Sequence, residues 1–301
     1  DLRQLLDVPY LHLWIAEDVS ASKVVGVLLA YQEGGFATGV DELLNGIVNG
    51  QRRPQGNLLS QSLTNQSADT QWCRAKSLRV SRIAVSHGYR RRGIASSLLN
   101  ALESFALAEG CDYWGSSFGF EPDLLAFWQS HQALPIHLGL HRDKASGMRN
   151  LMVVKALSEP FKKSCHSFYW QFVSDLPFWV NRYLVDLSAT TLANISNACL
   201  QFGCESEDEY HSQLALSERS DDYDQNRIQR FIRAELPYDK VYPSLCRVFS
   251  AVNKAPAKCP ITHSSLLLVP NWSVLAEKFQ LKGRRDVIAS IKAELIQLTT
   301  D

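Results

Sequence analysis

The first half of the chain alternates short apolar runs with segments of helical periodicity. Leu11–Ala16 and Val24–Tyr31 are rich in β-forming residues and flank a polar stretch, which predicts a β-hairpin. Beyond Gly93, apolar residues recur at helical spacing and stop near Gly110, which predicts an amphipathic helix. Further strands are predicted at residues 78–85, 113–118, 136–140 and 151–156, and further helices at residues 40–49, 58–63 and 123–129. This alternation predicts an α/β domain.

The second half of the chain has a different character. From Pro160 onward, helix-like segments rich in aromatic residues replace the alternating pattern. An acidic, polar stretch covers residues 205–224, and the last helix, at residues 274–298, is interrupted by a glycine. We therefore expect two domains, residues 1–158 and residues 159–301, of which the second is mostly helical.

Composition excludes several classes of protein. Hydrophobic residues make up 46% of the 301 residues, enough for buried cores. No apolar stretch approaches the roughly 20 residues that cross a bilayer, so we expect a cytoplasmic protein with no membrane partner. The 31 basic residues balance 31 acidic ones, which argues against binding of nucleic acid through bulk charge and leaves local basic patches open. Because the chain begins with Asp1 and Leu2–Leu6 already has helical character, we expect it to be part of a longer protein.

Cysteine and histidine spacing gives no sign of a metal site. The 7 cysteines form no C-x-x-C pair, and neither they nor the 8 histidines show zinc-like spacing. We expect reduced thiols and no structural metal.

A basic loop that contains a glycine, Arg90–Ser96, connects a predicted strand to a predicted helix. The N-terminus of a helix presents free backbone N–H groups and the positive end of the helix dipole, so this loop suits a diphosphate. Gly93 permits close approach of the backbone, the arginines before it can neutralise phosphate charge, and Ala95 is small. A solvated basic turn before an ordinary helix would have the same sequence. The phosphate-loop patterns G-x-x-x-x-G-K-[ST] and G-x-G-x-x-G do not match here.

The loop resembles the [QR]-x-x-G-x-[GA] loop of the GNAT acetyltransferases, and as in that family it follows a strand that contains Arg82–Val85. The resemblance implies an α/β fold with the GNAT mixed sheet flanked by helices. In that fold this strand carries a bulge and splays from its neighbour, and the pantetheine of acetyl-CoA pairs with the exposed backbone in the gap. The implied acetyl-CoA-binding residues are Ile83, Ala84, Val85, Arg90, Arg91, Arg92, Gly93, Ile94, Ala95 and Ser96.

Several separated blocks resemble the acetyltransferase half of the bacterial tRNA(Met) cytidine acetyltransferase family, in that family's order. The blocks are residues 1–9, 52–58, 79–85, 117–120 with 127–129, and 139–142 with 146–147. The tail resembles the C-terminal RNA-binding region of the family only weakly. The resemblance implies transfer of an acetyl group from acetyl-CoA to N4 of the wobble cytidine of elongator tRNA(Met), with a mostly helical tail that binds tRNA.

The same resemblance implies another partner and two more contacts. Full-length members carry an upstream helicase-like module that hydrolyses ATP, and no Walker loop occurs in this chain, so we expect any use of ATP to belong to that module. Members commonly place Glu and a basic residue at two cofactor-contact positions, which are Asp123 and Ser130 here. Asp123 keeps the charge on a shorter side chain, whereas Ser130 loses an ionic contact. Ala95 stands where the family usually has its second loop glycine.

The acceptor chemistry calls for a base and for donors to an oxyanion. The amine of cytosine is a poor nucleophile because its lone pair is delocalised, and it must lose a proton as the new bond forms. His12 is the first candidate for the base or for positioning the substrate, since it ends an Asp-x-Pro-x-x-His element that resembles one in the family. A histidine packed on an amphipathic strand would look the same. His141 is the second candidate, and a solvent-facing strand end explains it equally well. Backbone N–H groups near Val85 are candidates for the oxyanion.

Basic and aromatic residues indicate places where RNA would bind. Arg52, Arg53 and Arg142 are candidates for contacts with RNA phosphates, although an arginine pair before Pro-Gln-Gly also suits a solvated turn. The aromatic run Phe168–Phe172 suits either stacking on unpaired bases or a hydrophobic core. Regular spacing predicts one basic stripe on a helix of the tail, formed by Arg227, Arg230 and Arg233. Phosphate contact and plain solvation explain that stripe equally well.

Three functions are therefore open from the sequence. The first is acetylation of a tRNA cytidine. The second is a GNAT N-acetyltransferase that acts on a protein or small-molecule amine, with a tail for dimerisation or peptide binding. The third is a scaffold that binds RNA without catalysis, which the intact Arg90–Ser96 loop disfavours. Action on RNA predicts a continuous basic surface from the acetyl site to the helices beyond Pro160.

Overall fold

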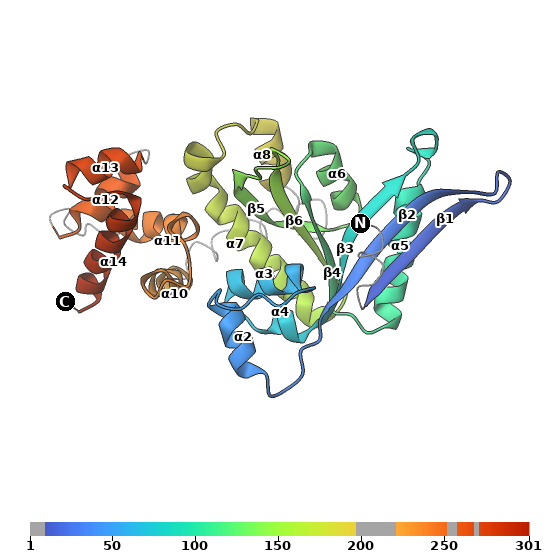
Figure 1. Cartoon of the computed structure of the whole chain (residues 1–301), viewed down its shortest axis with the longest axis horizontal. Helices are drawn as coiled ribbons and strands as arrows, with labels where there is room; N and C mark the ends of the chain where they lie inside the picture. The colour runs from blue at the N-terminus through green and yellow to red at the C-terminus, as the bar shows by residue number, and fades with distance from the viewer. Residues whose placement is uncertain (1–9, 197–220, 252–257, 268–270, 301) are drawn as a thin grey trace. The chain divides into compact units, whose positions relative to one another are not determined.

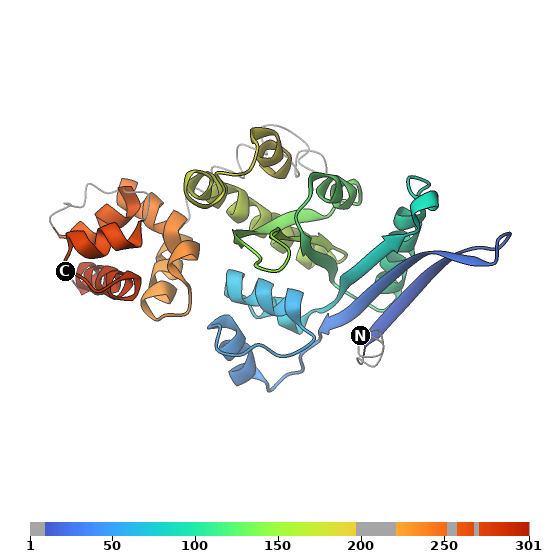
Figure 2. The same cartoon turned by 45° about the horizontal axis from the view of Figure 1, so that its top comes forward.

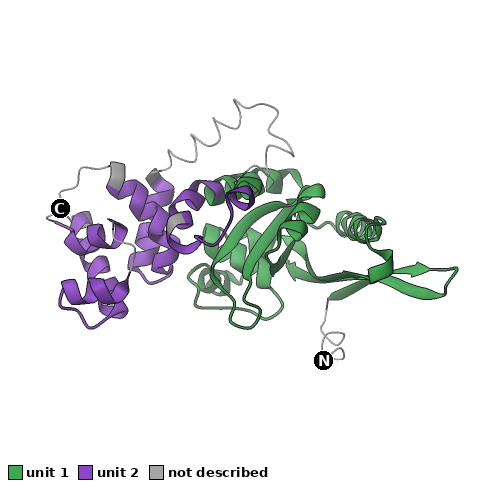
Figure 3. Ribbon diagram, turned by 90° about the horizontal axis from the view of Figure 1, so that it is seen from above, with its two compact units in different colours: residues 1–172, 193–205 green, residues 173–192, 206–301 purple. Residues whose placement is uncertain are grey.

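The computed structural model describes residues 10–196, 221–251, 258–267 and 271–300. The chain divides into two compact units, shown in different colours in Figure 3. Unit 1 comprises residues 1–172 and 193–205, and unit 2 comprises residues 173–192 and 206–301. The domain boundary expected after Ser158 stays a prediction. The helical character expected at residues 2–6 lies outside the described residues, and so does most of the acidic stretch.

Unit 1 is built on one 6-stranded sheet with the strand order β1-β2-β3-β4-β6-β5 (Figure 1). β3 and β4 run parallel, and the other neighbouring strands are antiparallel. The strands are β1 (Leu11–Asp18), β2 (Lys23–Gly34), β3 (Lys76–Val85), β4 (Tyr113–Gly119), β5 (Leu134–Arg142) and β6 (Arg149–Ala156). The predicted hairpin is confirmed, and the strands predicted at residues 136–140 and 151–156 pair with each other as β5 and β6. The mixed sheet flanked by helices that the resemblance implied is present.

Helices cover both faces of this sheet (Figure 2). The helices that lie within unit 1 are α2 (Asp41–Val48), α3 (Leu58–Ser67), α4 (Gln71–Arg74), α5 (Ile94–Ala108) and α6 (Pro122–Ser130), with the 3-10 turn η1 (His87–Tyr89). Successive side chains of a strand point to opposite faces. On β2, Gly26 faces Ile94 of α5, whereas Glu33 binds the start of α3 on the other face. The sheet therefore separates α5 from α3.

A buried carboxylate fixes the start of α3. Oε2 of Glu33 accepts hydrogen bonds from the backbone N–H groups of Leu59, at 2.7 Å, and Ser60, at 3.1 Å. The other carboxylate oxygen is ion-paired with Arg79 of β3. Burial raises the pKa of Glu33, and the Arg79 guanidinium opposes that shift. The free N–H groups and the positive dipole end of a helix favour a carboxylate at this position. Glu33 thereby ties α3 to β3, one residue before Val80.

The aromatic run at residues 168–172 belongs to the core of unit 1. It lies in the first part of α7 (Glu159–Tyr183), and its Phe168, Tyr169 and Trp170 are all buried. The ring of Phe168 lies 5.9 Å from that of Trp72, and the hydroxyl of Tyr169 donates to the backbone oxygen of Ile195 at 3.3 Å. Of the two explanations for this run, the hydrophobic core is confirmed, because stacking on bases needs an exposed ring face.

The described part of unit 2 is helical. It contains the second part of α7, the first part of α8 (Ala189–Ser196), α10 (Asp221–Ile232), α11 (Tyr238–Ala251), α12 (Pro260–Leu267), α13 (Trp272–Lys278) and α14 (Arg284–Thr300). The break predicted in the last helix is confirmed, since α13 and α14 are separate helices.

The basic stripe predicted on the tail is wrong as an accessible surface. Nη1 of Arg227 donates to a carboxylate oxygen of Asp175 at 3.0 Å, and the Arg230 side chain is only 2% exposed. Arg233 is ion-paired with Glu235 at 2.7 Å. Arg227 and Arg230 neutralise carboxylates of their own unit, because a buried guanidinium needs a partner of opposite charge. Only Arg233 keeps an exposed side chain, so the three arginines do not form one accessible stripe.

None of the described helices combines the length and the apolar character needed to cross a membrane. The described cysteines that are free thiols are Cys73, Cys111, Cys165, Cys246 and Cys259. Within the same residues, no group of three or more metal-ligating side chains comes together.

Candidate functional site

A fork between β3 and β4 forms the base of the site. The two strands pair only from Ser77 with Tyr113 to Val80 with Ser116. Beyond that point β3 continues alongside β2 to its end, and β4 continues alongside β6. The register of β3 against β2 shifts between residues 80 and 82, so Ser81 is the extra residue of a bulge. One backbone edge of β3 beyond the fork therefore faces a gap in place of a strand.

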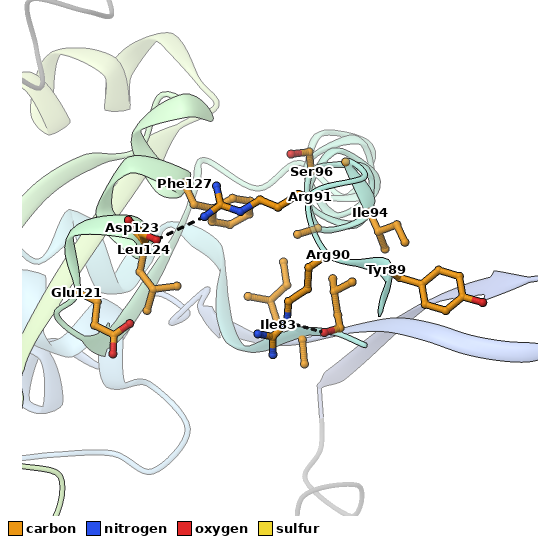
Figure 4. A pocket seen from close by; sticks show the side chains of 14 residues that line it. Ile83, Tyr89, Arg90, Arg91, Ile94, Ser96, Glu121, Asp123, Leu124 and Phe127 are labelled. Carbon is orange, nitrogen blue, oxygen red and sulfur yellow. Dashed lines mark hydrogen bonds and ion pairs between the residues drawn. The ribbon is translucent and has the colours of Figure 1, made fainter. Parts of the chain in front are cut away.

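A cavity of about 550 Å³ opens in this gap (Figure 4). The end of β3 and the loop into α5 form one wall, and the start of α6 forms the other. The residues that line it are Ile83, Ala84, Val85, Tyr89, Arg90, Arg91, Gly93, Ile94, Ala95, Ser96, Glu121, Asp123, Leu124 and Phe127. The first wall thus comes from one continuous strand–loop–helix segment, and the second comes from a helix that follows it in the chain.

The loop before α5 directs backbone N–H groups at this cavity. Arg91 and Gly93 both have left-handed backbone conformations, with φ values of 60° and 79°. No side chain caps the helix at Gly93, and the first bond inside the helix runs from the N–H of Ser97 to the oxygen of Gly93. The N–H groups of the first helical turn are therefore available to an anion, which the helix dipole also favours.

Each of the three arginines of the loop makes a different contact. Nε of Arg90 donates to the backbone oxygen of Val85 at 3.3 Å, which holds its guanidinium beside the end of β3. Arg91 reaches across the cavity to Asp123, 3.4 Å away (Figure 4). Both partners of that ion pair are about nine-tenths exposed, at 90% and 86%, so the pair is weak and an incoming anion can replace Asp123. Arg92 does not line the cavity, and its guanidinium stacks over the ring of Tyr89, 5.2 Å from the ring centroid.

A histidine that the sequence did not single out contacts the loop. Nε2 of His131, at the end of α6, lies 3.1 Å from Oγ of Ser96. Its ring also packs edge-on against Phe127, which lines the cavity. Burial lowers the pKa of His131, and Lys155 lowers it further, so the ring is held neutral. The contact fixes the hydroxyl of Ser96 at the rim of the cavity.

Most of the predicted cofactor residues line this one cavity, and two do not. Arg92 stacks on Tyr89, and the hydroxyl of Ser130 donates to the backbone oxygen of Phe127 at 2.7 Å within its own helix. Four lining residues had no prediction attached to them, namely Tyr89, Glu121, Leu124 and Phe127. Helical spacing would have placed Leu124 and Phe127 on one face of α6, but nothing in the sequence says that this face meets the loop.

His12 lies on β1 against α5, and it does not line the cavity. Its ring is 4.7 Å from that of Phe105 and 6.0 Å from that of Trp14. It is partly buried there, and this burial lowers its pKa, while Glu109 opposes the shift. His12 pairs with Ala30, which pairs with Val80, so the histidine lies two strands, or roughly 10 Å, from the fork.

The remaining predicted residues lie outside the cavity as well. His141 and Arg142 are exposed at the end of β5, where the Arg142 guanidinium donates to the backbone oxygen of Gly147 at 2.9 Å. Arg52 and Arg53 line a separate, smaller cavity beside α3. The predicted cofactor residues, apart from Arg92 and Ser130, therefore form one cluster at the fork. The predicted catalytic and RNA-binding residues lie at separate places in unit 1.

The arrangement suits a long ligand with an anionic part. The first turn of α5 and the arginines of the loop can hold a diphosphate, and the free edge of β3 can hydrogen-bond an extended chain of amides. Such a ligand would end in the fork, beside Val80 and Ser116, whose hydroxyl donates to the backbone oxygen of Val80 at 3.0 Å.

The sequence of this chain is similar to those of known acetyltransferases. Residues 3–123 match the model of the acetyltransferase (GNAT) family. The tRNA(Met) cytidine acetyltransferase of Pectobacterium atrosepticum is 32% identical over 278 residues, which are 92% of this chain and 35% of that protein. The protein of the same name from Vibrio cholerae is 29% identical over 299 residues, which are 99% of this chain and 38% of that protein. The chain thus spans little more than a third of the length of these relatives.

The similarity to solved structures is distant. FeeM, an N-acyl amino acid synthase from uncultured soil microbes, is 15% identical, with a TM-score of 0.38 over 52% of this chain and 74% of its own. A likeness this distant says nothing about the ligand.

Proposed function

Because this chain contains a domain of the acetyltransferase (GNAT) family and is a homologue of bacterial tRNA(Met) cytidine acetyltransferases, we propose that it transfers an acetyl group from acetyl-CoA to a tRNA cytidine. The proposed acceptor is N4 of the wobble cytidine of elongator tRNA(Met). The observation that carries the proposal is the fork between β3 and β4, where a free strand edge and an uncapped helix N-terminus lie on the same wall of the cavity.

The residues at the fork fit acetyl-CoA. The N–H groups at the start of α5 would hold the diphosphate, and Arg90 and Arg91 would balance its charge. The edge of β3 at Ile83–Val85 would bind the amides of the pantetheine, as a strand binds an added strand. Ser96, held by His131, would contribute its hydroxyl to the phosphates. When bound, acetyl-CoA supplies an acetyl group activated as a thioester.

The chain itself has to orient the cytosine amine and take up its proton. Backbone N–H groups of β3 beside the fork would donate to the oxyanion that forms at the acetyl carbonyl oxygen when the amine attacks. His12 and His141 stay candidates for the base. A neutral His12 can accept a proton, and because it lies roughly 10 Å from the fork, the proton would pass through water. Once the carbon–nitrogen bond has formed, collapse of the tetrahedral adduct would break the carbon–sulfur bond, and the CoA thiolate would leave and take up a proton, with no covalent intermediate on the protein.

The test is acetylation of a defined RNA. The chain is incubated with acetyl-CoA and a tRNA(Met) transcript, and the nucleosides after nuclease digestion are measured by mass spectrometry. A transcript with uridine at the wobble position is the control. We expect N4-acetylcytidine in the first transcript only. Absence of N4-acetylcytidine, even after the chain is joined to the ATPase module of a relative, would refute the proposal. Transfer to a peptide or small amine in its place would support the alternative acceptor.

A further inference from the structure

A second cavity of unit 1, of about 220 Å³, lies away from the fork. It is formed by the end of α2, the loop that follows and one side of α3. Its lining residues are Ile47, Gly50, Arg52, Arg53, Leu58, Gln61, Ser62 and Asn65. The set contains two guanidinium groups, two amides and a hydroxyl, and no acidic side chain. This composition suits an anion and would repel a cation.

The walls of this cavity are fixed by short-range contacts. The backbone N–H of Arg52 donates to the oxygen of Gly46 at 2.9 Å. The side-chain stem of Arg52 packs so closely on Gly46 that a Cβ there would lie 2.5 Å from its Cγ. On the opposite wall, Nδ2 of Asn65 donates to the backbone oxygen of Val48 at 2.8 Å, which joins α3 to the end of α2. The cavity is thus preorganised, which lowers the entropy cost of binding a ligand.

The two guanidinium groups differ from the other arginines around them. Arg74 and Arg79, in the same unit, are ion-paired with carboxylates. Arg52 and Arg53 are exposed, and among the described residues neither has an ion pair or a side-chain hydrogen bond. Two adjacent arginines with free N–H groups at the mouth of a cavity match the oxygens of a phosphate.

A single helix connects this cavity to the fork. Leu58 lines the cavity, and the next residue, Leu59, donates its N–H to Glu33. Glu33 is ion-paired with Arg79, which precedes Val80 at the fork. These contacts fix the position of the cavity relative to the fork.

We propose that the Arg52–Arg53 cavity binds a backbone phosphodiester of the RNA that presents its cytidine to the fork. The inference rests on the proposed function, since it needs an RNA acceptor. It gives that acceptor a second point of attachment, which would orient the RNA without contact to the reacting atoms. Phosphate contacts of this kind position a nucleic acid and carry no sequence information.

The test uses an anticodon stem-loop RNA of tRNA(Met) and two double variants of the chain. Arg52→Gln with Arg53→Gln removes both charges and keeps polar side chains on the cavity wall. Lys23→Gln with Lys163→Gln removes two exposed charges that line neither cavity, so both variants have the same net charge. RNA affinity is measured by fluorescence anisotropy over a range of salt concentrations. Acetyl-CoA affinity and the unfolding midpoint are measured for each variant.

We expect the arginine variant to bind the RNA about tenfold or more weakly. Its affinity should also depend less steeply on salt, with a slope smaller by about 0.7 for each RNA phosphate that the arginines no longer neutralise. The lysine variant should keep both the affinity and the slope. Acetyl-CoA affinity and the unfolding midpoint should not change in either variant, which excludes misfolding. In turnover, the KM for RNA should rise while kcat stays the same.

Equal losses of affinity in the two variants would overturn the inference, because they would report bulk charge alone. No loss in the arginine variant, or a wild-type chain that does not bind the RNA, would overturn it as well. If millimolar inorganic phosphate displaced the labelled RNA as strongly as unlabelled RNA does, the cavity would be a site for a free anion, which would also overturn the inference. A failure of the proposed function can be told apart from a failure of this inference. In that case the RNA would still bind through both arginines, but no N4-acetylcytidine would form.

Discussion

Gly93 offers a direct test of the helix N-terminus as an anion site, because Gly110 serves as its matched control. The two glycines bracket α5 in similar left-handed conformations, with φ values of 79° and 66°. At neither position would an added Cβ meet another atom within 4 Å. Gly93→Ala and Gly110→Ala therefore impose the same backbone strain with no steric clash.

The two variants should lose the same stability. An L-residue in the left-handed region costs about 1–2 kcal/mol relative to glycine. For a unit of this size, each kcal/mol lowers the melting temperature by about 2–4 °C. Thermal unfolding followed by tryptophan fluorescence should show similar shifts for both.

Acetyl-CoA affinity should separate the two variants. Only Gly93 precedes the N–H groups that face the cavity, so relief of the strain by the loop would move these donors away from the diphosphate. Removal of one hydrogen bond to a charged group costs about 1.5–3 kcal/mol, which corresponds to binding about ten- to a hundredfold weaker. Isothermal titration of acetyl-CoA measures this. Equal affinities for Gly93→Ala and Gly110→Ala would refute the assignment of the loop as the diphosphate site.

Two further predictions concern the scaffold around the site. Glu33→Gln leaves Arg79, whose side chain is only 13% exposed, without its counter-ion, so the free energy of unfolding in urea should fall by about 3–5 kcal/mol. Asp41→Asn, which breaks an exposed ion pair, should change it by about 0–1 kcal/mol, and equal losses would contradict the role of burial. Burial lowers the pKa of His131, so below about pH 6.5 the ring takes up a proton more readily in the unfolded protein than in the folded one. The free energy of unfolding should therefore decrease as the pH is lowered. His131→Gln should weaken this fall in pH-dependent urea denaturation, and an unchanged pH dependence would show that the ring titrates alike in both states.

The sequence alone determined the parts of the molecule that depend on local order. The β1–β2 hairpin and the strand–loop–helix segment from β3 through Gly93 to α5 follow from periodicity and from the place of one glycine. A diphosphate site at a helix N-terminus is made by consecutive residues, which is why the loop and the end of β3 were found together. The wall contributed by α6 could not be found in this way, because Leu124 and Phe127 meet the loop only after the strands have paired.

Tertiary structure decided which charged and aromatic side chains are available. Arg91 and Arg92 are neighbours in one loop, yet the first crosses the cavity and the second stacks on Tyr89. Arg227 has the sequence spacing of an accessible stripe and is buried against Asp175. His12 packs against α5, away from the cavity lining. Sequence spacing gives the direction of a side chain from its own backbone, but burial and partners depend on the segments that fold against it.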